Sequence, residues 1–185
     1  MGTSSFFLKR TVATLLALAL NSPPAFAQDR ASELLAELQG ASELEARRIE
    51  RDLDIIWSRS GSAAMDLLLS RGREALEAED PDAAIEHLTA LTDHAPDFAE
   101  GFHARATAYF QADLYGPALD DLQRTLVLNP DQFDAMFGLG VIFEEIGDLR
   151  RAEQAFQQVL ALNPQHENAK TALEALKRKG IGRSL

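Results

Sequence analysis

Cysteine is absent from this 185-residue chain, which excludes disulfide bonds, thiolate nucleophiles and cysteine-ligated zinc sites. Basic residues are scarce: 18 Lys and Arg stand against 29 Asp and Glu, a formal net charge of −11. Because nucleic-acid binding needs clustered cations facing the phosphates, we expect no nucleic-acid partner. Long hydrophobic runs are missing as well, since the most apolar run, residues 11–20, would cover only about half of a ~30 Å bilayer core.

Motifs of catalysis and metal binding are also missing. The sequence has no phosphate-binding glycine loop, no G-x-S-x-G, no H-E-x-x-H and no EF-hand loop. His87 and His94 lie seven residues apart on one expected helix, so a histidine-based metal site is the less favoured alternative. We therefore expect a protein that is not an enzyme and that holds no cofactor or metal.

The first 27 residues have the three parts of a Sec-type signal peptide. Lys9 and Arg10 form a positive start, residues 11–20 form an apolar stretch, and Ala25-Phe26-Ala27 is a small-x-small cleavage pattern. An ordinary amphipathic N-terminal helix is the alternative reading. The pattern predicts cleavage after Ala27 and a periplasmic mature chain without a transmembrane span.

A repeat of 34 residues organises the chain from residue 63 onward. Proline recurs at Pro96, Pro130 and Pro164. Apolar residues recur at the same interval, in the columns Gly72/Ala106/Gly140, Ala84/Ala118/Ala152, Leu88/Leu122/Phe156 and Leu68/Phe102/Met136. Two helices packed ~8–10 Å apart need small residues where their backbones come closest, and large residues fill the space beside them. The repeat therefore predicts helix pairs that stack on one another to cover their apolar faces.

Each unit is expected to contain two helices. The predicted helices are 63–78 and 81–94, 97–112 and 117–128, and 131–146 and 149–162. Pro81 stands where a helix can begin, because an N–H in the first turn has no helical partner to lose. Gly147 is expected to end one helix and Asp148 to cap the next, and Asp97 with Glu100 has the pattern of a capping box.

These columns are similar to those of the tetratricopeptide repeat (TPR) family. The third unit matches through Leu139-Gly140, Phe143, Gly147-Asp148, Ala152, Phe156 and Pro164, and the second through Ala106, Tyr109, Tyr115, Ala118 and Pro130. Arg71 and Arg105 stand where the family usually has leucine, and their charged ends are expected to pair with acids. The resemblance implies an all-α fold, a right-handed α-solenoid of three hairpins over residues 63–164, at about 65–98, 99–132 and 133–166.

Helical caps are expected at both ends of the solenoid. Residues 28–62 predict an atypical helix pair that covers its open N-terminal end, with Ser42 and Glu45 as a capping box. An oligomerising coiled coil is the alternative there, although the segment has too few heptads. Residues 165–179 predict a C-terminal capping helix, and residues 180–185 a basic disordered tail. Contact of that tail with a membrane or an anionic polymer is its functional alternative.

The resemblance also implies a concave groove, lined by the first helix of each unit. The residues carried to groove-facing positions are Leu69, Arg73, His103, Thr107, Phe110, Gln111, Phe137, Val141, Glu144 and Glu145. Phe110 and Phe137 are the expected anchors, because aromatic side chains dominate interface energetics, although packing against the neighbouring unit is an equal alternative for both. The family's carboxylate clamp for chaperone peptides is disfavoured, since it needs Lys and Asn and neither occurs between residues 30 and 115.

We therefore expect a protein–protein interaction module exported to the bacterial cell envelope, which holds a peptide or helix of a partner in this groove. Glu144 and Glu145 favour a basic partner. A structural subunit that self-associates through the acidic body and basic tail is the alternative, and the histidine-based metal binder is less favoured.

Overall fold

The computed structural model describes residues 25–178 and 180, with side chains from residue 29 onward. The predicted signal peptide up to residue 24 and the predicted tail beyond Gly180 lie outside the described residues. Within the described part the chain is entirely helical. Its helices are α1 (Ala25–Leu38), α2 (Glu43–Trp57), α3 (Ala63–Glu77), α4 (Pro81–His94), α5 (Ala99–Gln111), α6 (Tyr115–Leu128), α7 (Phe133–Glu145), α8 (Leu149–Leu162) and α9 (Glu167–Arg178). None of these helices is long and apolar enough to cross a membrane.

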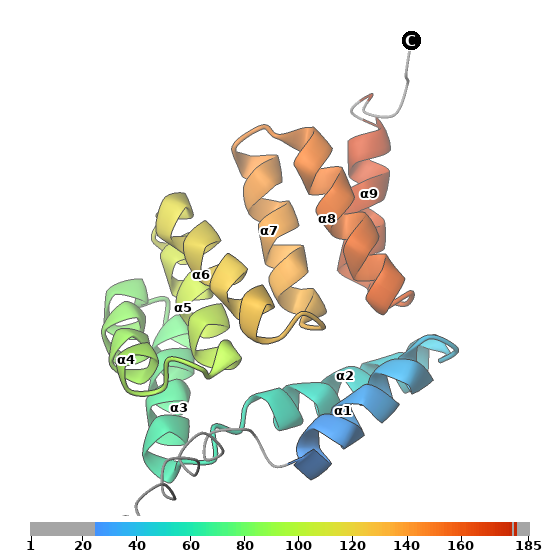
Figure 1. Cartoon of the computed structure of the whole chain (residues 1–185). Coiled ribbons are helices and arrows are strands. Elements are labelled where there is room, and N and C mark those ends of the chain that lie inside the picture. Colours follow the sequence, from blue (N-terminus) through green and yellow to red (C-terminus); the bar gives the residue numbers. More distant parts are fainter. Residues whose placement is uncertain (1–24, 179, 181–185) are drawn as a thin grey trace, which may run out of the picture.

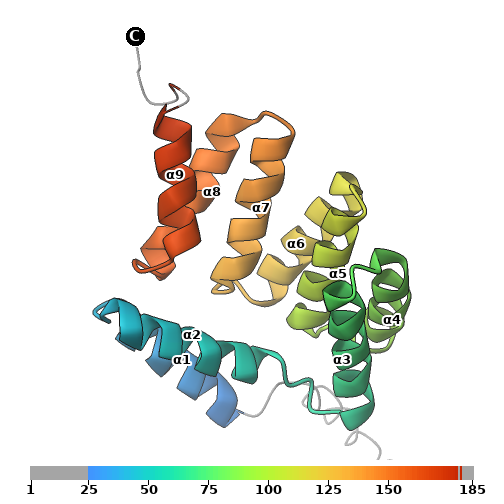
Figure 2. The same ribbon diagram turned by 180° about the vertical axis from the view of Figure 1, so that it is seen from behind.

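Helices α3 to α8 form three antiparallel pairs, one for each 34-residue unit, stacked into a curved array (Figure 1). The first helices of the pairs, α3, α5 and α7, lie on one side together with α9, and α4, α6 and α8 lie on the other (Figure 2). The predicted all-α solenoid is therefore confirmed, and the helix boundaries agree with the predicted ones to within two residues.

Small residues sit where the two helices of a unit approach each other. A Cβ atom added to Gly140 would lie 2.6 Å from Cδ1 of Phe156, whose ring is fully buried. A Cβ atom at Gly72 would lie 2.5 Å from the Leu88 side chain. Because real Cβ contacts are rarely closer than about 3.4–4.0 Å, the small column sets the spacing of the helix pairs.

Each turn between two paired helices contains one residue with a positive φ angle. The residue in the left-handed region is Glu79 (φ 55°) in the first unit, Asp113 (φ 58°) in the second and Gly147 (φ 80°) in the third. Asp148 then caps α8, its Oδ1 accepting from the Arg151 N–H at 3.1 Å, as predicted. The predicted capping box at Asp97 and Glu100 is wrong, because α5 begins later, at Ala99, and the Glu100 carboxylate is engaged elsewhere.

The caps at the two ends behave differently. Helix α9 buries Ala169, Leu173 and Leu176 in one hydrophobic cluster with the third unit, so it covers that unit as expected. The N-terminal pair α1–α2 does not cover the first unit. It contributes its buried side chains to that same cluster, at the far end of the repeat array (Figures 1 and 2).

This difference from the expected N-terminal cap has a physical reason. Units one and two have separate cores of their own, whereas Trp57 packs edge-on against Phe133 of α7 with ring centroids 5.6 Å apart. A stretch that follows the repeat frame at Leu34 but not at Asp54 buries its apolar stripe against the third unit instead.

Candidate protein-binding groove

The ten residues predicted to line the groove fall on α3, α5 and α7, on the side seen in Figure 2. The structure divides them into three sets: two that are packed into the core, two that belong to a polar cluster, and six on the remaining surface of the groove.

Leu69 is too buried to contact a ligand, contrary to expectation, and Phe137 packs against neighbouring helices. Leu69 is 2 % exposed and packs in one cluster with Ala104 and Ala108 of α5. The Phe137 ring lies 5.4 Å from the ring of Phe156 and 5.1 Å from that of His166, so it fills the space between α7, α8 and the start of α9. These contacts support the packing alternative for Phe137, which is partly buried, and its role as an anchor stays a prediction.

The open surface of the groove carries one aromatic ring and a rim of polar groups. Phe110 is partly buried, with its ring 5.7 Å from that of Tyr115. Thr107, Gln111 and Glu145 are exposed, and Val141 and Glu144 are partly exposed. This surface combines a partly buried aromatic ring with carboxylates near the C-terminal end of α7, where the helix dipole is also negative.

A polar cluster joins the three units where α5 and α7 begin. Glu100 is 4 % exposed; its carboxylate accepts hydrogen bonds from Arg73 at 2.7 Å and from Nε2 of Gln132 at 2.5 Å. Nδ1 of His103 lies 3.2 Å from Oε2 of the same carboxylate. Arg73 also reaches Oδ1 of Asp54, on α2, at 3.2 Å.

The cluster shifts the ionisation of its members. Burial alone would raise the pKa of Glu100, but the charges and hydrogen bonds of His103 and Arg73 lower it below its ordinary value. Burial alone would lower the pKa of His103, and the adjacent Glu100 carboxylate raises it above its ordinary value. Both groups are therefore favoured in their charged forms, as a buried ion pair requires.

The same inter-unit contact recurs one repeat later. Glu100 accepts from Gln132, which directly precedes α7, and Oδ1 of Asp134 lies 3.4 Å from Nε2 of His166, which directly precedes α9. Residues 66, 100 and 134 are all acidic and lie 34 apart, so the sequence carried a signal for these contacts. In the first unit Asp66 instead accepts from the Ser60 N–H at 2.9 Å.

A second ion pair lies behind the groove, between the helices of unit two. Arg105 donates from Nε to Asp121 at 2.7 Å and from Nη2 at 2.9 Å, and from Nη1 to Thr92 at 2.7 Å. The hydrogen bonds to Asp121 raise the pKa of Arg105 above its ordinary value. The expectation that Arg105 pairs with an acid is confirmed, and its guanidinium carbon also lies 5.5 Å from the ring centroid of Phe102 and 5.7 Å from that of Tyr109.

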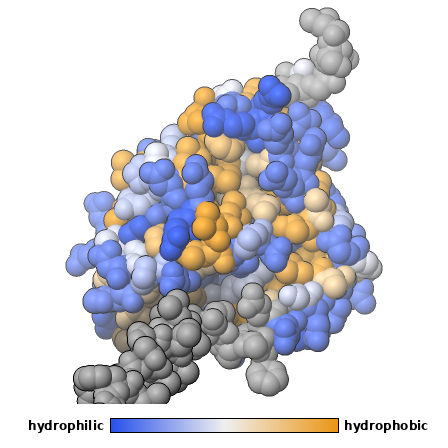
Figure 3. Space-filling view, viewed as in Figure 1, coloured by the Kyte–Doolittle hydropathy of each residue, from blue (hydrophilic) through white to orange (hydrophobic). Residues whose placement is uncertain are grey.

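Metal-binding clusters and buried polar atoms without a partner are both absent from the described residues. Among the described residues, no three His, Asp or Glu side chains converge on a possible metal position, and every buried side-chain nitrogen or oxygen has a hydrogen-bond partner. Apolar surface is also visible on the opposite side, where the lower ends of α6 and α7 meet the N-terminal helices (Figure 3). At that end of α6, Val127 is 72 % exposed.

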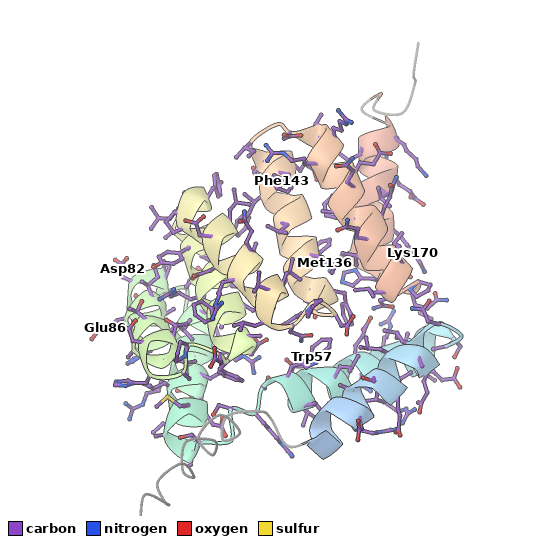
Figure 4. The ribbon with its side chains drawn as sticks, viewed as in Figure 1. Trp57, Asp82, Glu86, Met136, Phe143 and Lys170 are labelled. Carbon is purple, nitrogen blue, oxygen red and sulfur yellow. The ribbon has the colours of Figure 1, made fainter. Side chains whose placement is uncertain are left out.

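The contacts of α2 with two of the repeat units could not be predicted from the sequence. Figure 4 shows Trp57 between α2 and the start of α7, while Asp82 and Glu86 project outward from α4. Through Asp54 and Trp57, α2 contacts residues on α3 and α7 at once.

Comparison with known proteins gives a consistent result. A family model described as "Tetratricopeptide repeat" matches residues 69–116 and 103–167. A TPR repeat-containing protein of Rhizobium etli is 26 % identical over 156 residues, which are 84 % of this chain and 76 % of that protein.

Two solved structures share the fold of the repeat region. The Sgt2 TPR domain of Aspergillus fumigatus is 26 % identical, with a TM-score of 0.61 over 64 % of this chain and 80 % of that one. The second TPR domain of human RPAP3, in complex with the HSP70 peptide SGPTIEEVD, is 28 % identical, with a TM-score of 0.56 over 58 % of this chain and 90 % of that one.

Proposed function

Because the chain belongs to the tetratricopeptide repeat family, we propose that it is a non-enzymatic protein-binding module that holds a basic segment of a partner in the groove lined by α3, α5 and α7. The observation that carries the proposal is the surface around Phe110, whose ring precedes the exposed Gln111 and lies 5.7 Å from that of Tyr115, a side chain that interacts electrostatically with Glu145. Partly buried aromatic side chains in such a setting supply most of the energy at protein interfaces.

Charge selects the class of partner. The RPAP3 domain is in complex with a peptide that ends in Glu-Glu-Val-Asp, which is acidic. This chain has no lysine between Lys9 and Lys170, and the C-terminal ends of its groove helices carry Glu77, Glu144 and Glu145. Carboxylates at these positions repel an acidic peptide and attract lysine or arginine side chains.

The test is capture of partners by the immobilised full chain. Phe110→Ala with Gln111→Ala removes the open groove contact, and we expect it to abolish capture without changing the helicity measured by circular dichroism. The matched control is Asp82→Ala with Glu86→Ala, on the outer face of α4 (Figure 4), which should capture normally. Equal capture by both double variants would overturn the groove assignment.

A charge reversal tests the partner class separately. Glu145→Lys should weaken capture most at low salt, because exposed charges are screened over about 8 Å at physiological ionic strength. An acidic partner would respond in the opposite direction and bind the variant more tightly.

We also infer that the chain works in the bacterial cell envelope. Support comes from the sequence, in which Lys9 and Arg10 precede an apolar stretch and Ala25-Phe26-Ala27 follows it. N-terminal sequencing of the protein from fractionated cells should give a periplasmic chain that begins at Gln28. A full-length chain in the cytoplasmic fraction would contradict the inference.

A further inference from the structure

The hairpin α1–α2 is attached to one end of the repeat array and docked on the other. Its buried residues share a single hydrophobic cluster with the third unit and α9; on the hairpin they are Ala31, Leu34, Leu38, Ala46, Ile49 and Leu53. Units one and two form two other clusters that contain no hairpin residue. The hairpin is therefore not needed to complete the core of the unit to which it is joined.

Polar groups fix the turn of the hairpin to the end of α8. Nε2 of Gln39 donates to the backbone carbonyls of Leu162, at 2.7 Å, and of Ala161, at 3.2 Å. Carbonyls in the last turn of a helix have no partner within the helix, so Gln39 supplies what the helix end lacks. Nearby, Nδ2 of the buried Asn163 donates to the carboxylate of Glu50 at 2.5 Å.

The other end of the hairpin reaches the groove. Asp54 accepts from Arg73, one of the residues predicted to face a ligand, and this pair is largely exposed. Trp57 covers Phe133, which is 1 % exposed. Helix α2 therefore reaches α3 through Asp54 and the start of α7 through Trp57 (Figure 4).

The connection between the hairpin and the repeats is short and has few packing contacts. Only residues 58–62, Ser-Arg-Ser-Gly-Ser, separate α2 from α3. A Cβ atom added to Gly61 would meet no atom within 4 Å, and Ser60 holds the linker to the start of α3 by donating its N–H to Asp66 at 2.9 Å. A short tether keeps a released segment at an effective concentration on the order of millimolar, which favours rebinding.

We propose that α1–α2 acts as an intramolecular ligand that a partner can displace. It occupies a surface formed by Phe133, Asn163 and the carbonyl end of α8. When the hairpin is released, that surface binds an amphipathic helix of the partner. This regulation rests on the proposed function, because the surface adjoins the groove at Arg73. Apolar surface continues beyond the hairpin toward the exposed end of α6 (Figure 3), so an incoming helix has a place to make first contact.

The hairpin itself indicates the chemistry of the incoming helix. Ile49, Leu53 and Ile56 form an apolar stripe on α2, with Glu50 and Asp54 beside it as carboxylates facing Asn163 and Arg73. An amphipathic helix with this spacing and an acidic residue opposite Arg73 meets the same groups. The apparent affinity of the chain for such a helix is reduced, because only the chains whose hairpin is released can bind it.

The experiment uses a fluorescent synthetic peptide of residues 29–58 as the probe, added to the full chain. Gln39→Ala with Trp57→Ala weakens docking while leaving the two hydrophobic clusters of units one and two intact. This variant should bind the peptide at least tenfold more tightly than the unmodified chain. Leu44→Ala, at a position that is 80 % exposed on the same hairpin, is the matched control and should bind as the unmodified chain does.

A locked variant makes the test independent of any loss of folding. Because the chain has no cysteine, Gln39→Cys with Ala161→Cys places two exposed thiols across the docking contact, to be bridged by a short bis-maleimide. The bridged chain should lose peptide binding, while the unbridged chain retains it. Equal binding by bridged and unbridged chains, or no gain from release, would overturn the proposal. The peptide assay does not involve Phe110 or Gln111, so its failure leaves the groove assignment to be judged by partner capture.

Discussion

The packing of α7 on α8 can be tested with two alanine substitutions on a single helix. Gly140→Ala would place a methyl group 2.6 Å from Cδ1 of the fully buried Phe156 ring. Gly138→Ala would place one 3.3 Å from the δ carbons of Leu122, the far end of a flexible side chain. Both changes gain the same helix propensity, about 1 kcal/mol, so the difference between them isolates the steric term.

That steric term should be large. Adding a methyl group against a well-packed ring costs about 1–3 kcal/mol, because the ring must leave its rotamer or the helices must separate. We therefore expect Gly140→Ala to unfold about 1–3 kcal/mol more easily than Gly138→Ala in urea, followed by circular dichroism and by Trp57 fluorescence. Phe156→Leu should partly rescue Gly140→Ala, as a double-mutant cycle would show. Equal stability of the two alanine variants would refute the role of the small column.

Three further variants probe the polar contacts. Arg105→Leu restores the residue usual in the family but should lower the free energy of unfolding in urea by about 3–5 kcal/mol, because it leaves the buried Asp121 carboxylate without its partner. Adding Asp121→Leu to the same chain should recover most of the lost stability. The raised pKa of His103 means that this residue stabilises the folded chain fully below pH 6.5, its ordinary pKa, and that this stabilisation is lost as pH rises through the pKa of the folded state. The lowered pKa of Glu100 means that this residue stabilises the folded chain fully above pH 4.5, its ordinary pKa, and that this stabilisation is lost as pH falls through the pKa of the folded state. Stability measured against pH should therefore include a component that peaks between these two values and disappears in His103→Gln, and an unchanged profile in that variant would contradict the ion pair. Asp148→Ala removes the cap of α8 and should lower the melting temperature, at a cost of about 1 kcal/mol, whereas no change would show that the cap is unimportant.

The repeat frame predicted the solenoid because its determinants are local and periodic. The spacing of Gly72 and Gly140 in the sequence is enough to place each helix pair, since a small residue is needed wherever two helix backbones meet. Turn residues such as Gly147 carry their backbone preference wherever they occur. These features need no knowledge of the rest of the chain.

The parts that the sequence could not supply depend on distant neighbours. Gln39 donates a hydrogen bond to the carbonyl of Leu162, 123 positions away, and no sequence repeat relates the two residues. Phe110 and Phe137 both fall on groove-facing positions and both are partly buried, but the neighbours of Phe137 include the His166 ring, which lies beyond the third repeat unit. Repetition specifies which face of a helix a residue occupies, while neighbours outside the repeat determine whether that face stays open.

The groove as the site of partner binding can be tested most directly by site-specific photocrosslinking in living cells. A photoreactive phenylalanine analogue at Gln111, in the groove, is compared with the same analogue at Glu86, on the outer face of α4 (Figure 4). We expect a covalent adduct with a protein partner from position 111 and none from position 86. An adduct formed from position 86 alone would contradict the account.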